Sequence, residues 1–470
     1  METTRRDFLK IGGAALASAT VLGGFTQTSS ASNLGPLRID PAERYWAAIR
    51  DEYKTNRMHF NTGTTGSLPL FAQENLAEYN RNRALDPVSG LSAYPSLNVR
   101  RASIATWLGA NTDEVYISNN TSDGMNAILL GIEWKAGDEI IMHQWEHGGG
   151  LGPAALVRDK YGVVLKMVEV AWPLTTKEAV VAAYEKGRTA KTKAMMLSGI
   201  AYKNGALLPH KELCTWARAN GIISIIDGAH YTGHLDVNLH DIGCDFNAMS
   251  GHKWLSGVAG TGVCYIRNSW KVSDAGWGLP KYWPYRPQGW GTSYGAQAVF
   301  GTIDANRVRP PVGTYSPAAS MQSVGDTNQP AFMTTADCAD FCYAIGSAKY
   351  FARITFLSSY MKAAVIKKFG AAALLSADNP DFNTGLTMYN PFNDKVTVAK
   401  INLLNAALTA RNIYSRTIDN RIKLGVPPYT STGTDTQYAI RVSTHWQFCY
   451  PVQIEDYLTI VAEEVAKIGL

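Results

Sequence analysis

The feature of this sequence that most constrains its fold is an alternation, between residues 114 and 266, of short β-type runs with helical patterns. Such alternation is typical of an α/β fold, in which a mostly parallel sheet lies between helices. Ligands of these sheets bind beyond the carboxyl ends of the strands. The predicted strands of this seven-stranded sheet are 115–118, 139–142, 163–168, 194–198, 222–226, 246–249 and 262–266.

The chain has 470 residues, which is more than one ordinary core holds and favours two domains. A long helical pattern starts at Phe332, runs to about Phe369 and leads into a smaller α+β unit. Residues 268–330 are rich in Trp, Tyr, Pro and Gly, and we interpret them as an insertion that forms a wall or lid of the site. The predicted divisions are a leader at 1–32, an N-terminal segment at 33–75, a large domain at 76–330 and a small domain at 331–470.

The N-terminus has the three regions of an export signal. Arg5 and Arg6 precede an uncharged stretch of small and apolar residues at 11–24, and a small-residue cleavage region ends near Ala31 or Ser32. This order resembles a twin-arginine signal. Because the apolar stretch is shorter than the roughly 20 residues that a spanning helix needs, we expect no stable membrane insertion. We expect export by the twin-arginine translocation machinery to the periplasm or beyond; a basic start that stays attached is the alternative.

The net charge argues against nucleic-acid binding, and the cysteine spacing argues against a metal site. The net charge of +5 is small for this length and forms no basic stripe, so we expect no nucleic-acid partner. The six cysteines include no CxxC pair and no metal-ligand spacing, so we expect no metal site. Apolar content of 46% and charged content of 18% are typical of a globular enzyme.

One lysine, Lys253, stands in a Ser-Gly-His-Lys-Trp turn just after an apolar run. Desolvation in such a turn lowers the pKa of a lysine and makes its amine a nucleophile toward carbonyls. The carbonyl we propose is the aldehyde of pyridoxal phosphate (PLP). That cofactor needs a lysine, an acid at its pyridine nitrogen, a surface against its ring and donors for its phosphate.

The acid is Asp227, which ends the apolar run 222–226. A carboxylate at a buried strand end needs a cation, and the protonated pyridine nitrogen of PLP is one. An Asp that caps the next helix is the alternative. His230, three residues later, is placed to bond the phenolic oxygen of the ring, or is a structural histidine.

The phosphate and the ring face have candidates after two earlier strands. Thr121 and Ser122 open a helix, where free N–H groups and hydroxyls suit a phosphate; both types are also ordinary N-caps. His147 precedes three glycines, which allow close approach of the backbone to a ring. We predict that His147 stacks on PLP and carries protons, with a surface loop as the alternative.

A β-type run near the C-terminus, residues 438–445, holds one arginine, Arg441, among apolar residues. An arginine grips a carboxylate with two parallel hydrogen bonds. We therefore predict that Arg441 binds the α-carboxylate of an amino-acid substrate; a structural arginine in a salt bridge is the alternative.

These motifs together resemble the class V aminotransferase family of fold type I PLP enzymes, over about residues 60–470. The most specific segments are Asp227-Gly228-Ala229-His230 and Ser250-Gly251-His252-Lys253-Trp254, followed by Glu146-His147 and Arg441-Val442-Ser443-Thr444-His445. The resemblance implies that Lys253 forms the Schiff base, that Ser250 and His252 bind the phosphate, and that the protein is a homodimer. The segment from Phe60 to Gly66 resembles isopenicillin N epimerase-like proteins, which implies that Asn61 contacts the substrate.

Three departures from the family qualify the resemblance. Cysteine desulfurases carry a cysteine on a loop before the arginine strand, but residues 411–437 contain none, which disfavours persulfide chemistry. Tyr202 stands where many relatives have an Asn beside the cofactor, and we expect it to contact the substrate. The threonine that reaches the partner subunit's phosphate is either Thr302 or Thr327, and Thr327 is preferred slightly.

We therefore expect an exported PLP enzyme that acts at the Cα-amino group of an amino acid or a peptidyl amine, of the epimerase or aminotransferase type. One alternative is a C–S lyase or desulfurase-like enzyme, and another is a periplasmic enzyme that tailors a peptide siderophore. The alternative of another class is a non-catalytic periplasmic binding protein with a degenerate site.

Overall fold

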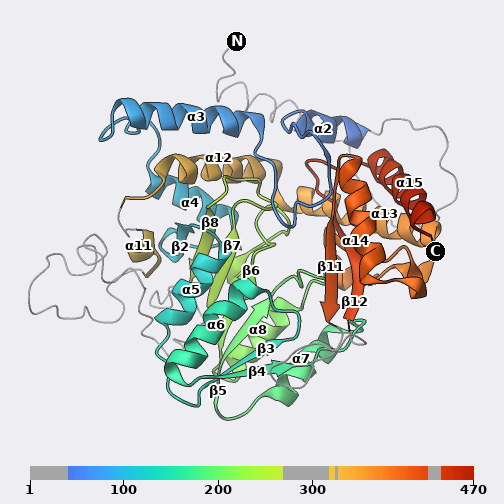
Figure 1. The fold of residues 1–470 in the computed structure, drawn as a ribbon. Coiled ribbons are helices and arrows are strands. Elements are labelled where there is room, and N and C mark those ends of the chain that lie inside the picture. The colour runs from blue at the N-terminus through green and yellow to red at the C-terminus, as the bar shows by residue number, and fades with distance from the viewer. Residues whose placement is uncertain (1–40, 268–316, 323–325, 422–435, 470) are drawn as a thin grey trace, which may run out of the picture.

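The computed structural model describes residues 41–267, 317–322, 326–421 and 436–469 (Figure 1). The predicted leader, Thr302 and most of the 268–330 insertion lie outside these residues. Within the described part of the chain, no helix is long and apolar enough to cross a membrane.

A seven-stranded sheet forms the centre of the larger part of the molecule, as predicted. Its order is β2-β8-β7-β6-β5-β3-β4; β8 is antiparallel to both neighbours and the other pairs are parallel. Each predicted strand is present, with ends that differ by at most two residues, which confirms the α/β fold class. The strands are β2 (Val115–Ser118), β3 (Glu139–His143), β4 (Val164–Val168), β5 (Thr192–Ser198), β6 (Ile223–Gly228), β7 (Phe246–Ser250) and β8 (Gly262–Ile266).

Helices cover both faces of this sheet (Figure 1). Alternate residues of each strand point to opposite faces, and they enter two separate apolar cores. Val115 and Ile117 of β2 belong to the core shared with α4, α7 and α8, whereas Tyr116 belongs to the core shared with α5 and α6. The helices of this part are α3 (Leu70–Leu85), α4 (Leu97–Trp107), α5 (Thr121–Gly131), α6 (Gly148–Tyr161), α7 (Lys177–Gly187), α8 (His210–Ala219), α9 (Leu239–Ile242), α11 (Pro317–Gln322) and α12 (Gln329–Ile345).

The C-terminal part is the smaller α+β unit that the sequence predicts. Its antiparallel sheet has the order β11-β12-β9, with β9 (Leu386–Tyr389), β11 (Arg416–Arg421) and β12 (Thr436–Ser443). The helices are α13 (Ser347–Phe369), α14 (Val398–Ala410) and α15 (Pro451–Ile468). The exact domain boundaries stay predictions.

The long helical pattern from Phe332 to Phe369 is two helices, α12 and α13, where we predicted one. Gly346 separates them and has a φ of +92°, a conformation that ends a right-handed helix and that glycine adopts without strain.

The N-terminal segment joins the two parts. After α2 (Pro41–Arg50), the short strand β1 (Met58–His59) pairs in parallel with β10 (Ile413–Tyr414) of the C-terminal unit. The loop that follows β1 then reaches the turn that carries Lys253, because the Gly66 N–H donates to the His252 carbonyl over 2.7 Å.

Candidate active site

The predicted site residues collect at one edge of the large sheet. Strands β3, β5, β6 and β7 run parallel, so their carboxyl ends share an edge. Asp227 lies near the end of β6, while His147 and Lys253 follow β3 and β7. Strands β6 and β7 are neighbours, with Asp227 opposite Ala248, so Asp227 and the turn with Lys253 lie at adjacent strand ends. In keeping with this, the charge of Lys253 lowers the pKa of both Asp227 and His147.

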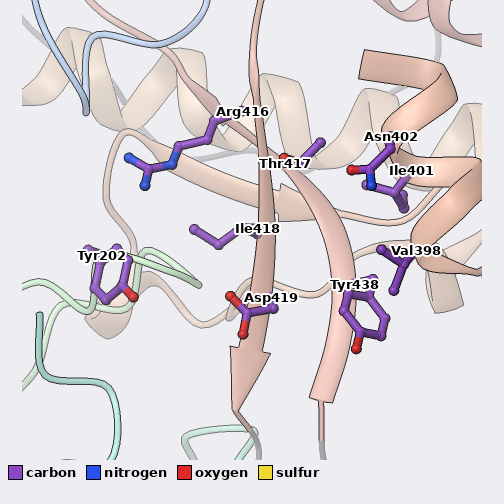
Figure 2. Close-up of a pocket in the computed structure, with 9 residues that line it drawn as sticks. All are labelled: Tyr202, Val398, Ile401, Asn402, Arg416, Thr417, Ile418, Asp419 and Tyr438. Carbon is purple, nitrogen blue, oxygen red and sulfur yellow. The ribbon is translucent and has the colours of Figure 1, made fainter. Parts of the chain in front are cut away.

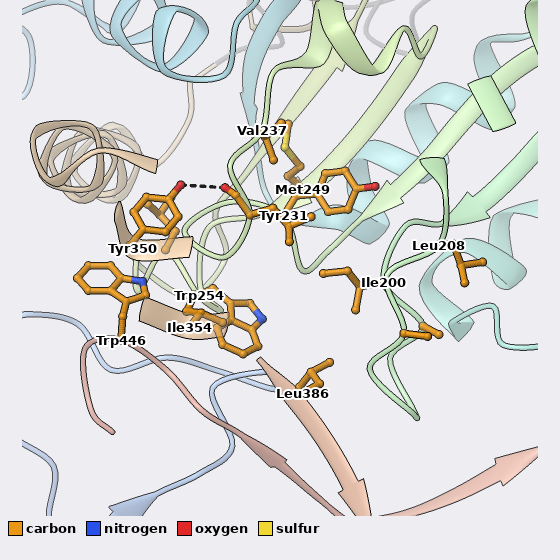
Figure 3. Close-up of a cluster of buried hydrophobic side chains, with 14 of the residues drawn as sticks. Ile200, Leu208, Tyr231, Val237, Met249, Trp254, Tyr350, Ile354, Leu386 and Trp446 are labelled. Atoms are coloured by element: carbon orange, nitrogen blue, oxygen red, sulfur yellow. Dashed lines mark hydrogen bonds between the residues drawn. The ribbon is translucent and has the colours of Figure 1, made fainter. Parts of the chain in front are cut away.

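The turn that carries Lys253 is anchored by the next residue, Trp254, whose side chain is fully buried. Its ring stacks on His234, with centroids 3.7 Å apart and planes inclined by 22°. Figure 3 shows Trp254 in the same buried cluster as Leu386. Its Nε1 donates to Nδ1 of His230 over 3.0 Å, so the proton of this neutral histidine is on Nε2, available as a donor.

Burial lowers the pKa of the Lys253 amine to about 8. The nearby Asp227 carboxylate opposes this shift, and the charges of Arg441 and Arg416 add to it. A large fraction of the amine is therefore neutral near pH 8, which is the nucleophilic form that the sequence predicts.

Asp227 is buried at the end of β6 and keeps one oxygen free. Its Oδ1 accepts a hydrogen bond from the Ala229 N–H over 3.1 Å, whereas its Oδ2 is buried without a partner. Burial raises the pKa of Asp227, and Lys253 opposes this shift. The residues after β6 form turns, and α9 is capped by Asn238 instead, so Asp227 is not a helix cap.

Glu146 is a buried carboxyl beside the site, and no role was predicted for it from the sequence. It accepts hydrogen bonds from the Ser198 N–H over 2.9 Å and the Ser198 hydroxyl over 2.6 Å, and it lies 3.0 Å from Nε2 of His143. Burial raises the pKa of Glu146 to about 8, and the charge of Asp227 adds to this shift. Ser198 is the register partner of Asp227 across β5 and β6, so Glu146 lies one strand away from that carboxylate.

His147 is the N-cap of α6, and its Nδ1 accepts from the Gly149 N–H over 3.0 Å. Its ring meets the Tyr202 ring edge to face, with centroids 4.7 Å apart. Burial lowers the pKa of His147 to about 4, and Lys253 adds to this shift. The imidazole is therefore neutral and fixed in orientation at physiological pH.

The predicted phosphate ligands lie at the start of α5 and in the lysine turn. Asn120 is the N-cap, so Thr121 and Ser122 are the first two helical residues, whose N–H groups have no partner within the helix. The Thr121 Oγ1 and the His252 Nδ1 are buried without partners. The Ser250 hydroxyl donates to the Ala229 carbonyl over 2.5 Å, so in this arrangement its proton is not available to a phosphate oxygen.

Thr327 and Thr302 stay untested as ligands of a partner's phosphate. Thr327 lies just before α12, where its carbonyl accepts from the Gln329 N–H over 2.7 Å. Thr302 lies outside the described residues.

Arg441 is buried in the centre of β12 and has no acid in ion-pair distance within the described part of the chain. Its Nη1 donates to the Tyr202 carbonyl over 2.7 Å, and its Nη2 donates to the Thr64 Oγ1 over 3.1 Å and approaches the Asn61 Oδ1 at 3.3 Å. Its Nε is buried without a partner. Burial lowers the pKa of Arg441 to about 9, and the neighbouring Arg416 adds to this shift. An unpaired buried guanidinium of this kind is suited to a carboxylate ligand.

A cavity of about 240 Å³ opens beside β11, next to these residues (Figure 2). Arg416 and Tyr202 line it from one side of the strand, and Asn402 and Tyr438 line it from the other. Arg416 and Thr64 received no role from the sequence, because nothing in their local pattern marks them.

The partnerless polar atoms match the needs of PLP. The free Asp227 oxygen is buried and requires a cation, as the protonated pyridine nitrogen is. The Thr121 hydroxyl, the free N–H groups of α5 and, once protonated, the His252 ring match the oxygens of a phosphate. Lys253, with its lowered pKa, completes the set.

Comparison with known proteins agrees with this geometry. Residues 60–277 match the family model Aminotransferase class-V. Isopenicillin N epimerase of Streptomyces clavuligerus is 26% identical over 334 residues, which cover 71% of this chain and 80% of that protein.

Two solved structures share the fold. The cystine C–S lyase C-DES, in complex with its reaction product cysteine persulfide, has a TM-score of 0.68 at 21% identity, with 87% of this chain and 98% of that chain covered. The cysteine desulfurase of Thermococcus onnurineus NA1 has a TM-score of 0.69 at 20% identity, with 90% and 98% covered. On these grounds the chain is a PLP-dependent enzyme whose residues 60–277 match the class-V aminotransferase family.

Proposed function

We propose that this enzyme acts at the Cα-amino group of an amino acid or a peptidyl amine, as an epimerase or an aminotransferase. The observation that carries the proposal is that Lys253 and Asp227 influence each other in one site, where the amine has a lowered pKa and the buried carboxylate keeps a free oxygen.

The residues present indicate how PLP would be held. Lys253 would bind its aldehyde, and Asp227 would face its ring nitrogen. His147 would lie against its ring, while Thr121, Ser122 and His252 would surround its phosphate. Ser250 would join them once its hydroxyl proton turned from the Ala229 carbonyl to a phosphate oxygen. The cofactor supplies an aldehyde that captures amines and a ring that accepts electrons from the substrate's Cα.

The remaining chemistry belongs to side chains of this chain. Arg441 would receive the α-carboxylate of the substrate and thereby fix which Cα bond faces Lys253. The Lys253 amine, with its pKa of about 8, is a base able to take the Cα proton at neutral to mildly alkaline pH. His147 is neutral and its Nδ1 accepts from the Gly149 N–H, so it would offer its Nε2 proton as a donor in the site. The position at which the proton returns separates epimerisation from transamination.

A desulfurase that forms a persulfide on its own cysteine is disfavoured. All six cysteines lie among the described residues, and all are buried. Burial raises the pKa of the Cys449 thiol, near the arginine strand, to about 12, which keeps it in the unreactive form. A C–S lyase needs no such cysteine. It is the second candidate, favoured by the fold shared with C-DES.

Borohydride reduction of the purified full-length protein tests the proposal. We expect a visible absorption band that borohydride abolishes, and peptide mapping should place the added cofactor mass on Lys253. Lys362 is a matched control, because burial also lowers its pKa to about 8. Its ammonium, however, is held by the Ala377 carbonyl and the Asn383 amide oxygen. Label on Lys362, or a colourless protein that takes up no PLP, would overturn the proposal and favour a binding protein.

The outcome of the reaction is read by incubating the protein with amino acids in heavy water. A gain of mass with retained amine indicates epimerisation or exchange, oxo-acid formation indicates transamination, and sulfide release indicates the lyase.

Export and assembly belong to the same proposal. The leader supports passage through the twin-arginine machinery, and Arg5→Lys combined with Arg6→Lys should retain the protein in the cytoplasm.

We propose a homodimer in which the partner's copy of Thr327 or Thr302 reaches the phosphate. Light scattering that gives the mass of a monomer for the PLP-loaded protein would refute the dimer.

A further inference from the structure

Two arginines from adjacent strands meet at the site. Arg416 of β11 and Arg441 of β12 are direct register partners. Both donate to the same hydroxyl, the Thr64 Oγ1, each over 3.1 Å, so these two guanidinium nitrogens lie at most about 6.2 Å apart. Thr64 in turn donates to the Asn61 Oδ1 over 2.8 Å, which fixes the position of the shared oxygen.

Neither arginine has an acidic partner among the residues that the structure describes. Two buried arginines elsewhere do: Arg100 pairs with Asp337, and Arg267 pairs with Asp245. The acid closest along the strand to Arg416 is Asp419, whose carboxylate lies 3.3 Å from the Lys203 ammonium. Arg441 is buried and Arg416 is half-buried, so two like charges held this close without a counter-charge form a site suited to an anion.

Arg416 also reaches a space that Arg441 does not line. It forms part of the wall of the cavity of about 240 Å³ beside β11, together with Tyr202, Ile418 and Asp419, whose carboxylate is already paired with Lys203 (Figure 2). Tyr202 links the cavity to the site, since its ring contacts His147 and its carbonyl accepts from Arg441. A substrate whose α-carboxylate is bound by Arg441 can therefore extend past Tyr202 toward Arg416.

We propose that Arg416 binds a second carboxylate, carried by the distal end of the substrate. The substrate class is then a dicarboxylic amino acid, or a peptidyl amine that ends in a free carboxylate. This inference rests on the proposed function for the role of Arg441, and it adds that the enzyme selects for a second negative charge. Arg416 is the specificity-determining residue. A substrate with an uncharged distal end cannot form the bidentate contact with its guanidinium.

Calorimetric binding of small diacids tests the inference apart from catalysis. Succinate, glutarate and adipate lack an amine and cannot react, and each is compared with its own monoamide, which differs by one charge. We expect at least one diacid to bind at least about tenfold more tightly than its monoamide, and Arg416→Gln to reduce that ratio to below about threefold. Arg411→Gln is the matched control, because Arg411 is already paired with Glu463 and Glu464 at the surface; it should leave the ratio unchanged.

The possible results separate cleanly. Equal binding of each diacid and its monoamide overturns the inference, whatever the visible band shows. A loss of affinity in Arg416→Gln that is the same for diacids and monoamides also overturns it, because Arg416 would then share the first carboxylate with Arg441. Loss of the band on Lys253 bears on the proposed function alone. In the active enzyme, the preference for glutamate over glutamine, or for aspartate over asparagine, should fall in Arg416→Gln and partly return in Arg416→Lys.

Discussion

Replacing Glu146 by glutamine tests how the raised pKa of this buried carboxyl, one strand away from Asp227, changes the stability of the protein with pH. Burial raises the pKa of Glu146 from its usual 4.5 to about 8, despite its hydrogen bonds from Ser198. Because the folded state holds this proton more tightly than the unfolded chain, the group's contribution to stability is complete below about pH 4.5. It is lost progressively as the pH rises through about 8.

The size of the effect follows from the two pKa values. At about 1.36 kcal/mol per pKa unit, ionisation of this one group removes about 3–4 kcal/mol from the free energy of unfolding between pH 5 and pH 8. Glutamine does not ionise, so Glu146→Gln lacks this loss. Rearranged hydrogen bonds to Ser198 and His143 cost about 1–2 kcal/mol at every pH. The variant should therefore be the less stable protein at pH 5 and the more stable one at pH 8.

Urea unfolding of the cofactor-free protein, followed by tryptophan fluorescence at pH 5, 6.5 and 8, measures this difference. Glu464→Gln is the control. Hydrogen bonds from Lys467 and Arg411 hold the pKa of Glu464 below its usual value, so its contribution changes only at more acid pH and should stay flat across this range. A difference between Glu146→Gln and the natural protein that changes by less than about 1 kcal/mol from pH 5 to pH 8 would refute the reasoning.

Two further predictions concern the lysine turn. Gly66→Ala places a Cβ 2.2 Å from the Lys253 carbonyl oxygen, so the turn must shift, and we expect a lower PLP content and a displaced visible band. Gly152→Ala, whose Cβ meets nothing within 4 Å, should change neither quantity. In stopped-flow measurements, the rate at which cofactor-free protein takes up PLP should rise through a midpoint near pH 8, well below the 10.5 of an ordinary lysine. Asp227→Asn should move that midpoint to lower pH, because the carboxylate raises the pKa of Lys253; an unchanged or higher midpoint contradicts the pairing.

The large sheet could be predicted from the sequence because its strands are short apolar runs that turns separate. The predicted limits at 115–118 and 262–266 coincide with β2 and β8, both of which are buried along their whole length. The break at Gly346 could not be predicted in the same way. A single glycine is tolerated inside helices, and its φ of +92° depends on how α12 and α13 pack.

Some residues of the site could likewise be predicted from local sequence, whereas others are brought together only by folding. Asp227 and Lys253 stand directly after strands, so the parallel order of the sheet brings them together. The Arg416 contact with Thr64 joins residues 352 positions apart, and no local pattern indicates it. Glu146 belongs to a motif that the sequence shows, but its neutral state arises from burial against Ser198, which only the folded chain supplies.

The short segment after α2 is fastened at three places: to β10 through β1, to both arginine side chains through Thr64, and to the lysine turn through Gly66. A movement of the C-terminal unit relative to the large sheet is therefore expected to displace the backbone beside Lys253. Thr64, which holds both arginines, and Gly66, which holds the lysine turn, are only two positions apart, so a ligand that moves the arginines is expected to move the backbone beside Lys253 as well.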